Sequence, residues 1–324
     1  MHEKVYEQWL KMDELSNQKV PFFFMVDFLK ENVEIYTEFE TSEMGLLFDF
    51  QNDTGVDLKY ANKLLKWETF PESKEDYQKG FDIVQKNINL GNSYLVNYTK
   101  KTPIKTNLSL EEIYKLTRAK YKVCIPNRFV FFSPETFIEI IDNKIYTHPM
   151  KGTIDASIEN AAEVLKNDIK EKAEHYTVVD LLRNDLSMVA DNVNVDDFQR
   201  IDLLKTKQKD LLTMSSEISG NIKPEYQNNI GKILNTLLPA GSILGAPKPK
   251  TLEIILEAES QPRGFYSGVC GWFDGKNLDS CVMIRFIEKE GEDLFFRSGG
   301  GITHRSNLDS EYQEMKNKIY VPIY

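Results

Sequence analysis

Apolar and polar positions alternate along the chain with two different periods, and these periods predict a mixture of helices and strands. Helices are predicted at the N-terminus and over residues 74–89, 110–121, 161–184, 249–257 and 309–320. Short apolar runs predict strands over residues 22–28, 93–98 and 129–132, a strand pair over 33–39 and 45–50, and a hairpin over 138–146 that turns at Asp142-Asn143. Three later runs, 265–273, 280–288 and 293–298, predict an antiparallel meander.

Composition describes a large folded protein. With 324 residues and 41% hydrophobic content the chain can bury a sizeable core, and the break at 71–73 predicts that an N-terminal segment, 1–74, packs on a main domain, 75–324. A net charge of −10 argues against a nucleic-acid partner. Three widely spaced cysteines indicate neither a disulfide framework nor a zinc site. Without a recognisable signal peptide or membrane-spanning run, we expect a cytoplasmic protein with no membrane partner.

The hexapeptide His148-Pro149-Met150-Lys151-Gly152-Thr153 sets a lysine between Pro and Gly at the end of the predicted hairpin. Proline fixes its own φ, and glycine lets the backbone come close to a bound molecule. A lysine held in this way can act as a nucleophile if its pKa is lowered, because only the neutral amine attacks carbon. On this peptide alone, a surface lysine after a turn is the alternative.

Acidic residues recur every three positions on two predicted helices. They are Asp168, Glu171 and Glu174 on the first helix, and Glu311 and Glu314, with Lys318, on the second. Residues at this spacing share one helix face, so two Glu-x-x-Glu pairs could meet around one divalent cation. A set made only of oxygen ligands favours Mg²⁺. Solvated acidic faces are the alternative.

Three further features could contact a ligand. Arg285 lies in the apolar middle run of the meander, where a guanidinium is costly unless it meets an anion; a ligand carboxylate and an internal ion pair are both open. The run Gly299-Gly300-Gly301 offers backbone amides to a ligand, or makes only a tight bend. The Gly- and Pro-rich loop 239–248 lacks the Gly-x4-Gly-Lys-Ser/Thr pattern of a nucleotide loop.

In their order along the chain, these motifs resemble those of the chorismate-utilising enzymes over residues 75–324. The matching motifs are Ser133-Pro134-Glu135, Pro149 to Thr153, Ala173-Glu174-His175, Val179 to Leu186, Gly241-Ser242 to Pro247-Lys248, Ile284-Arg285, Gly299 to Ile302, and Glu311-Tyr312-Gln313-Glu314. The resemblance implies an α+β fold of the anthranilate synthase component I type. Two large antiparallel sheets would pack face to face with helices outside, and the active site would lie in the cleft between them.

Two positions separate the branches of this family. The place matching Leu95 carries a water-activating lysine in the isochorismate and salicylate branch, and an isobutyl group cannot take a proton. The place matching Lys151 is usually Ala in anthranilate synthases, which leaves room for ammonia at C2; a lysine there would send the amino group to C4. The resemblance therefore implies component I of aminodeoxychorismate synthase, on the route to para-aminobenzoate and folate. The alternatives are anthranilate synthase component I and a non-catalytic chorismate-binding subunit.

The same resemblance implies a role for each candidate residue. Glu174 and Glu314 would bind Mg²⁺ directly, and Glu171 and Glu311 would assist through waters, so that the metal holds the ring carboxylate of chorismate. Glu135 would protonate the departing C4 hydroxyl, which requires a raised pKa. Lys151 would be the second catalytic residue. Substrate-binding positions would be Gly152, Thr153, Tyr266, Arg285, Gly299, Gly301 and Lys318.

The partners follow from the same resemblance. No Cys-His-Glu amidotransferase arrangement is recognisable, so a glutamine amidotransferase subunit, component II, would supply ammonia, and an aminodeoxychorismate lyase would act on the product. The sequence departs from the family at Thr213, where members often carry His or Gln, and at Leu244, where Thr is common. No Leu-Leu-Glu-Ser signature of a regulatory tryptophan pocket is found before residue 75.

Overall fold

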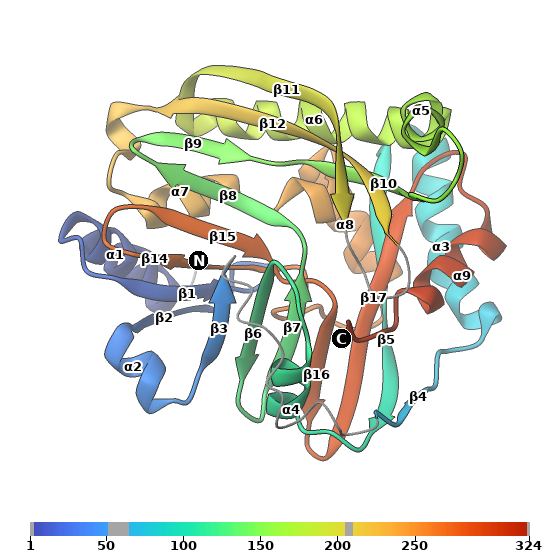
Figure 1. Ribbon diagram of the computed structural model, residues 1–324, viewed down its shortest axis with the longest axis horizontal. Helices are drawn as coiled ribbons and strands as arrows, with labels where there is room; N and C mark the ends of the chain where they lie inside the picture. The colour runs from blue at the N-terminus through green and yellow to red at the C-terminus, as the bar shows by residue number, and fades with distance from the viewer. Residues whose placement is uncertain (1–2, 51–64, 205–209, 323–324) are drawn as a thin grey trace.

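The computed structural model describes residues 3–50, 65–204 and 210–322, except for the side chains of Lys151, Lys170 and Leu204. Among the described residues the strands form two antiparallel sheets, one of nine strands and one of eight, with helices around them (Figure 1). This is the α+β architecture predicted from the sequence.

The nine-stranded sheet has the order β10-β12-β9-β8-β15-β14-β1-β2, and β11 pairs with β12 outside this order, all among the described residues. Its strands are β1 (Phe22–Val26), β2 (Val33–Thr37), β8 (Thr136–Ile141), β9 (Lys144–Thr147), β10 (Met150–Asp155), β11 (Ala190–Leu204), β12 (Leu211–Ile222), β14 (Val269–Phe273) and β15 (Leu278–Val282). The hairpin β8–β9 turns at Asp142 and Asn143, as predicted, and both residues have positive φ.

The eight-stranded sheet has the order β13-β5-β17-β16-β7-β6-β3, and β4 pairs with β5, again among the described residues. Its strands are β3 (Leu47–Phe50), β4 (Trp67–Thr69), β5 (Leu95–Thr106), β6 (Tyr121–Ile125), β7 (Phe129–Ser133), β13 (Gly245–Ala246), β16 (Phe286–Glu290) and β17 (Asp293–Ile302). Strand β17 pairs with β5 along most of its length. The run Gly299 to Gly301 lies within this paired part of β17.

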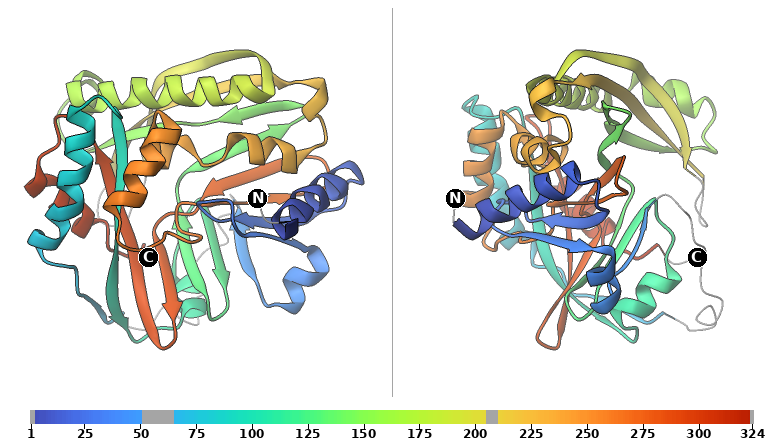
Figure 2. Two further views of the ribbon diagram at one scale, coloured as in Figure 1. Left: turned by 180° about the vertical axis from the view of Figure 1, so that it is seen from behind. Right: turned by 90° about the vertical axis from the view of Figure 1, so that its left-hand side faces the viewer.

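The helices are α1 (Glu3–Asn17), α2 (Glu38–Glu43), α3 (Lys74–Asn89), α4 (Leu110–Leu116), α5 (Ala161–Asn167), α6 (Ile169–Val189), α7 (Ile230–Leu237), α8 (Lys248–Ala258) and α9 (Leu308–Asn317). Short 3₁₀ turns cover Pro224–Tyr226 and Gly241–Ile243. Seen from behind, α1, α6, α7 and α8 spread over one side of the molecule (Figure 2). In the described part of the chain, no helix combines the length and apolar character needed to cross a bilayer.

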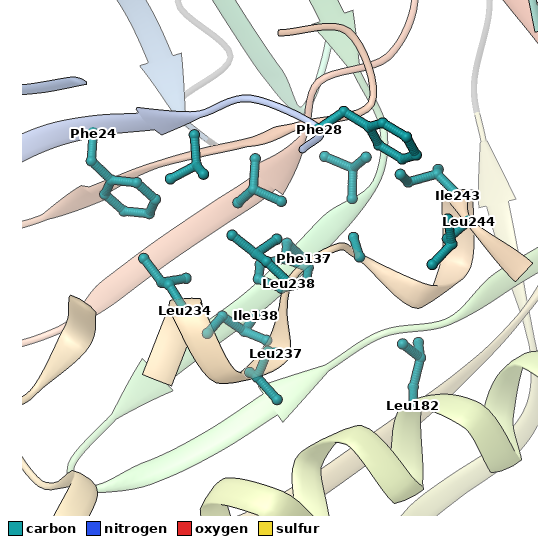
Figure 3. Packing of buried hydrophobic residues seen from close by; sticks show 14 of the residues in the cluster. Phe24, Phe28, Phe137, Ile138, Leu182, Leu234, Leu237, Leu238, Ile243 and Leu244 are labelled. Carbon is teal, nitrogen blue, oxygen red and sulfur yellow. The ribbon is translucent and has the colours of Figure 1, made fainter. Parts of the chain in front are cut away.

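Two layers of apolar side chains hold these parts together. One layer contains residues from strands of both sheets and the loops beside them, such as Phe23, Tyr121, Phe131 and Phe286, with no helical residue among its described members, so it lies between the sheets. The other joins helices to the sheets. Figure 3 shows part of it, where Leu182, Leu234, Leu237, Leu238, Ile243 and Leu244 meet Phe24, Phe28, Phe137 and Ile138.

Several predicted elements were wrong in extent or pairing. The helix predicted over 110–121 ends at Leu116, and Tyr121 begins β6. Strands β2 and β3 do not pair with each other, because α2 lies between them and carries the chain from one sheet to the other. A capping box between Thr37 and Glu40 starts α2 and ends β2.

The meander is also not one sheet. Its middle run splits into β15 and β16, which belong to different sheets, and Arg285 lies in the connection with a φ of 52°. Strands β11 and β12, which the sequence analysis did not predict, make one of the longest pairings in the structure. The helix predicted over 161–184 is interrupted at Asp168, which caps α6.

Candidate active site

A cavity of about 450 Å³ gathers side chains and backbone from both sheets and from two helices. Most of the predicted site residues line it: Glu135, Gly152, Thr153, Glu171, Glu174, Tyr266, Arg285, Gly299, Gly301, Glu314 and Lys318. These residues are far apart in the sequence, so the fold brings them together. The cavity is the candidate active site.

Lys151 follows Met150 and precedes Gly152, and both of these neighbours line the cavity. Its backbone pairs with Met214 in β12, and the register then shifts between Lys151 and Thr153. The lysine thus lies within a strand beside an irregularity of the β-bulge kind, a feature that re-aims side chains near functional sites. The side chain of Lys151 lies outside the described structure, so its catalytic role stays a prediction.

The backbone conformation and the close neighbours at position 152 require a glycine. Its φ of +73° suits glycine, and a Cβ here would lie 2.8 Å from Oε2 of Glu171 and 3.0 Å from Cδ1 of Leu165. The hydroxyl of Thr213 donates a hydrogen bond of 2.9 Å to the Gly152 carbonyl. Thr213 therefore fixes the bulge, a role for which a small hydroxyl residue is sufficient.

The glutamates of α6 and α9 approach the triglycine segment of β17. A Cβ on Gly300 would lie 3.1 Å from Oε1 of Glu314 and 3.5 Å from Oε2 of Glu311. On Gly301 it would lie 3.8 Å from Oε2 of Glu174. The absence of side chains at these positions lets three carboxylates from two helices come close to one strand.

Glu311 differs from the other three predicted glutamates of α6 and α9, since it does not line the cavity. Its residue is 3% exposed, and its Oε1 accepts a hydrogen bond of 2.6 Å from Ser306. Glu314 pairs with Lys318 at 2.7 Å, and Lys318 also donates to the Gly299 carbonyl at 2.9 Å. Lys318 thus connects the end of α9 to the strand that it faces.

The four predicted metal ligands are all glutamates. All four glutamates offer carboxylate oxygens, which suit a hard divalent cation such as Mg²⁺. Within the described ranges, however, no group of three or more His, Cys, Asp or Glu side chains is drawn together closely enough to hold a metal. The residues therefore fit the ion in their chemistry, and in this structure Glu314 is paired with Lys318.

Arg285 lies in the connection from β15 to β16, which crosses from one sheet to the other, and Tyr266 lies in the segment between α8 and β14. The prediction of Arg285 inside a strand was wrong: Met283 is tied to Gly268 by a backbone hydrogen bond, while the Arg285 carbonyl accepts from Phe132, so the chain changes sheets here. Arg285 makes no ion pair with another described residue, and its guanidinium lies 5.1 Å from the ring centre of Tyr320. It is therefore available to an anionic ligand.

Tyr266 is 4% exposed, and burial raises the pKa of its hydroxyl to about 12. It stays protonated at neutral pH and can donate a hydrogen bond. Glu135 lies between β7 and β8, where its N–H donates to Ser133 and its carbonyl accepts from Val282. These backbone bonds fix Glu135 at the cavity wall.

The loop 239–248 is held against the site by a buried ion pair. Lys248 and Asp185 of α6 are 2.6 Å apart, and the loop carries Ser242 and Ile243 into the cavity wall. Burial raises the pKa of Asp185 and lowers the pKa of Lys248, and the attraction between the two charges opposes both shifts. The pair positions the loop rather than contacting the cavity.

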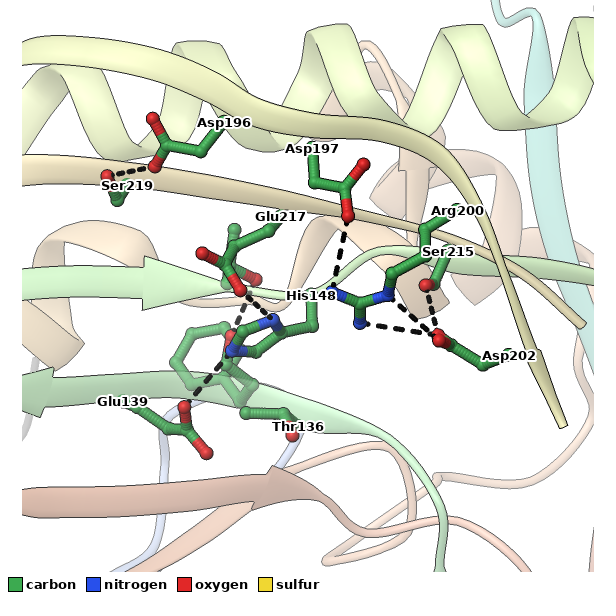
Figure 4. Close-up of polar contacts among 12 residues, drawn as sticks. Thr136, Glu139, His148, Asp196, Asp197, Arg200, Asp202, Ser215, Glu217 and Ser219 are labelled. Carbon is green, nitrogen blue, oxygen red and sulfur yellow. Dashed lines mark hydrogen bonds and ion pairs between the residues drawn. The ribbon is translucent and has the colours of Figure 1, made fainter. Parts of the chain in front are cut away.

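Polar contacts that the sequence analysis missed lie along the nine-stranded sheet (Figure 4). His148 Nε2 lies 3.0 Å from Glu139, and its Nδ1 lies 3.7 Å from Glu217. A second group of contacts joins Arg200 to Asp202 at 2.8 Å. The sequence pattern that could have predicted these contacts is the alternation of polar residues along β12, at Thr213, Ser215, Glu217 and Ser219. This alternation is typical of one face of a strand.

Comparison with known sequences places these observations in a family context. A sequence profile of chorismate binding enzymes matches residues 30–323. A PabA-like protein of Pasteurella multocida is 48% identical over 313 residues, which cover 96% of this chain and 97% of that protein. Anthranilate synthase component 1 of Saccharomyces cerevisiae is 30% identical over 263 residues, 76% of this chain and 51% of the yeast protein. The chain thus spans about half the length of the yeast protein.

Solved structures share the architecture. The menaquinone-specific isochorismate synthase of Escherichia coli superposes with a TM-score of 0.72 at 16% identity, covering 97% of this chain and 80% of that one. Anthranilate synthase component I of Streptococcus pneumoniae gives 0.68 at 21% identity, covering 91% and 70%. At these identities the likeness concerns the fold alone, and it confirms the predicted fold type.

Proposed function

Because this chain belongs to the chorismate binding enzyme family, we propose that it is component I of an aminodeoxychorismate synthase, which aminates chorismate at C4 on the way to para-aminobenzoate and folate. The observation that carries this proposal is the place of residue 151. Its two neighbours, Met150 and Gly152, line the cavity, so the backbone of Lys151 lies at the cavity wall. At Leu95 the chain offers only an apolar side chain, which cannot activate water.

The binding groups match the two carboxylates of chorismate. Arg285 can hold one carboxylate through paired N–H donors, and the protonated hydroxyl of Tyr266 can donate to the same group. Glu174 and Glu314, with Glu171 and Glu311 around them, would hold Mg²⁺. When bound, the ion supplies a positive charge for the ring carboxylate. These contacts orient the ring with both carboxylates fixed.

The proposed reaction uses two displacements. The neutral amine of Lys151 bonds to C2, the ring double bonds shift, and the C4–O bond breaks while Glu135 gives its proton to the departing hydroxyl, which leaves as water. Ammonia then bonds to C4, the double bonds shift back, and the C2–N bond to Lys151 breaks. The carboxylate of Glu135 takes up the proton that ammonia releases, so the enzyme returns to its starting state.

Ammonia supply needs a partner. The chain's three cysteines, Cys124, Cys270 and Cys281, are all buried, and burial raises the pKa of Cys124 to about 12. A glutaminase of the thiol type needs an accessible thiolate. We therefore assign glutamine hydrolysis to a separate amidotransferase subunit, component II, and conversion of the product to an aminodeoxychorismate lyase.

The test is to identify the product formed from chorismate, Mg²⁺ and ammonium chloride, with and without added aminodeoxychorismate lyase. The proposal predicts para-aminobenzoate only when the lyase is present, and no turnover when glutamine replaces ammonium. Direct formation of anthranilate would show the alternative amination at C2. Chorismate binding without any product would show a non-catalytic subunit.

A further inference from the structure

Arg263 is a buried cation that lies behind the wall of the active-site cavity. It is 3% exposed and is not among the described residues that line the cavity. Its Nε and Nη2 bind the two carboxylate oxygens of Glu259 at 2.9 and 2.7 Å. Nη2 also donates to the Asn97 carbonyl at 2.6 Å, and Nη1 donates to the Ile243 carbonyl at 3.2 Å. The ring centre of Phe28 lies 4.4 Å from the guanidinium.

The two carbonyls that Arg263 binds belong to different parts of the cavity wall. Asn97 lies in β5 and Ile243 lies in the loop 239–248, and both residues line the cavity. Hydrogen bonds from a charged donor are shorter and stronger than neutral ones. Arg263 therefore ties β5 to the loop at the place where both reach the cavity.

Tyr266 is held by the same arginine through the backbone. Its N–H donates to the Arg263 carbonyl at 3.1 Å, which is the hydrogen bond of a β-turn with Arg263 as its first residue and Tyr266 as its fourth. Within this turn, the Gly264 carbonyl accepts from the N–H of Phe28 at 2.9 Å. A displacement of Arg263 is therefore passed on to Tyr266.

Glu259 extends the connection to a fourth part of the wall. This residue caps the C-terminal end of α8, and its Oε1 accepts from the N–H and the hydroxyl of Thr99 at 2.8 and 2.9 Å. Thr99 is paired with Gly299 of β17, which lines the cavity. The buried pair of Arg263 and Glu259 thus joins four segments that are far apart in the sequence.

We propose that Arg263 is a positioning residue for chorismate binding, because it sets the place of Tyr266 relative to Asn97 and Ile243. This inference rests on the proposed function, in which the Tyr266 hydroxyl donates to a carboxylate of chorismate. Binding groups must be placed accurately, since a displacement of about 1 Å can cost roughly a hundredfold. Arg263 acts through the residues that it holds and does not touch the substrate.

The test replaces the forked guanidinium with a point charge. Arg263→Lys keeps a positive charge beside Glu259, but a compact ammonium cannot hold both carboxylate oxygens and both carbonyls. Arg128→Lys is the matched control. Arg128 also binds a glutamate, Glu34, through two bonds of 2.8 and 2.9 Å, and across the described ranges its side chain hydrogen-bonds to no residue that lines the cavity.

Calorimetry with chorismate and Mg²⁺ gives the Kd together with the number of competent sites, and initial rates with ammonium chloride give KM and kcat. Arg263→Lys should raise both the Kd and the KM for chorismate roughly tenfold or more, and Arg128→Lys should keep the wild-type values. A purely structural role would instead lower the number of competent sites and the apparent kcat, with Kd and KM unchanged. Phe28→Leu, which removes the ring beside the guanidinium, should raise Kd in the same direction and serves if Arg263→Lys fails to fold.

A double-mutant cycle tests whether Arg263 acts through Tyr266. Tyr266→Phe removes the hydroxyl and should itself raise the Kd for chorismate. If the position of that hydroxyl is what Arg263 controls, Arg263→Lys should raise Kd much less in the Tyr266→Phe background than in the wild type.

Failure of this inference and failure of the proposed function give different results. If folded Arg263→Lys and Phe28→Leu bind chorismate as tightly as the wild type, or if the effects of Arg263→Lys and Tyr266→Phe simply add, the positioning role is wrong and the proposed function stands. If the wild type binds chorismate but forms no C4 amine, the proposed function is wrong, and weaker binding by Arg263→Lys alone still supports the positioning role. If the wild type binds no chorismate, both are wrong.

Discussion

Replacing Gly152 with Ala should separate backbone strain from crowding of the site. A non-glycine residue at positive φ costs about 1–2 kcal/mol, and the new methyl group would also lie 2.8 Å from Oε2 of Glu171. Gly291→Ala is the matched control, because Gly291 has a φ of +61° and nothing within 4 Å of a Cβ. Both variants should lose about 1–2 kcal/mol of unfolding free energy through the backbone.

Only Gly152→Ala should also lose function, because the methyl group must displace the carboxylate of Glu171 from the cavity wall. Urea unfolding measures the stability of both variants, and the Mg²⁺ dependence of ammonium-supported turnover measures the site. We expect a weaker apparent affinity for Mg²⁺ and slower turnover in Gly152→Ala, with wild-type values in Gly291→Ala. Equal activity of the two variants would refute the claim that this glycine makes room for a metal-binding carboxylate.

Three other predictions concern charges in and behind the site. Glu174→Gln and Glu314→Gln should each abolish turnover while the unfolding midpoint stays close to that of the wild type, because Gln keeps the shape but loses the charge; activity in both would contradict the metal assignment. Asp185→Asn should destabilise the fold by about 3–5 kcal/mol in urea, since it removes the counter-charge of the largely buried Lys248 and leaves it its hydrogen bond to the Leu237 carbonyl, and adding Lys248→Met should restore most of the loss. With chorismate and no ammonia, rapidly quenched enzyme should show a mass increase of chorismate minus water on the peptide that contains Lys151; its absence would favour a purely electrostatic lysine.

Elements fixed by local signals were predictable from the sequence. Helix α3 begins and ends as predicted because Ser73 accepts a hydrogen bond from the N–H of Asp76, and its apolar residues at helical spacing, Tyr77, Phe81, Val84 and Ile88, are all buried. The site residues were found for a different reason. Their order along the chain resembles a family, and no periodicity places Glu135 near Glu314.

Elements that depend on distant contacts were not predictable. The run 280–288 has a continuous apolar strand pattern, and only hydrogen bonds to Gly268 and Phe132 divide it between two sheets. Asp168 matched the spacing of the acidic helix face, but its side chain accepts from the N–H of Glu171, so it caps α6 instead of sharing that face. The same local bond fixes the start of α6, and this helix carries Glu171 and Glu174 to the cavity.

The position of the new C–N bond tests the account most directly. Wild type and Lys151→Ala would be incubated with chorismate, Mg²⁺ and ¹⁵N-labelled ammonium. NMR spectroscopy would then identify the ring carbon that is bonded to ¹⁵N. We predict ¹⁵N on C4 with the wild type, and loss of that product with Lys151→Ala while chorismate still binds. Label on C2 with the wild type, or C4 amination by Lys151→Ala at the wild-type rate, would contradict the account.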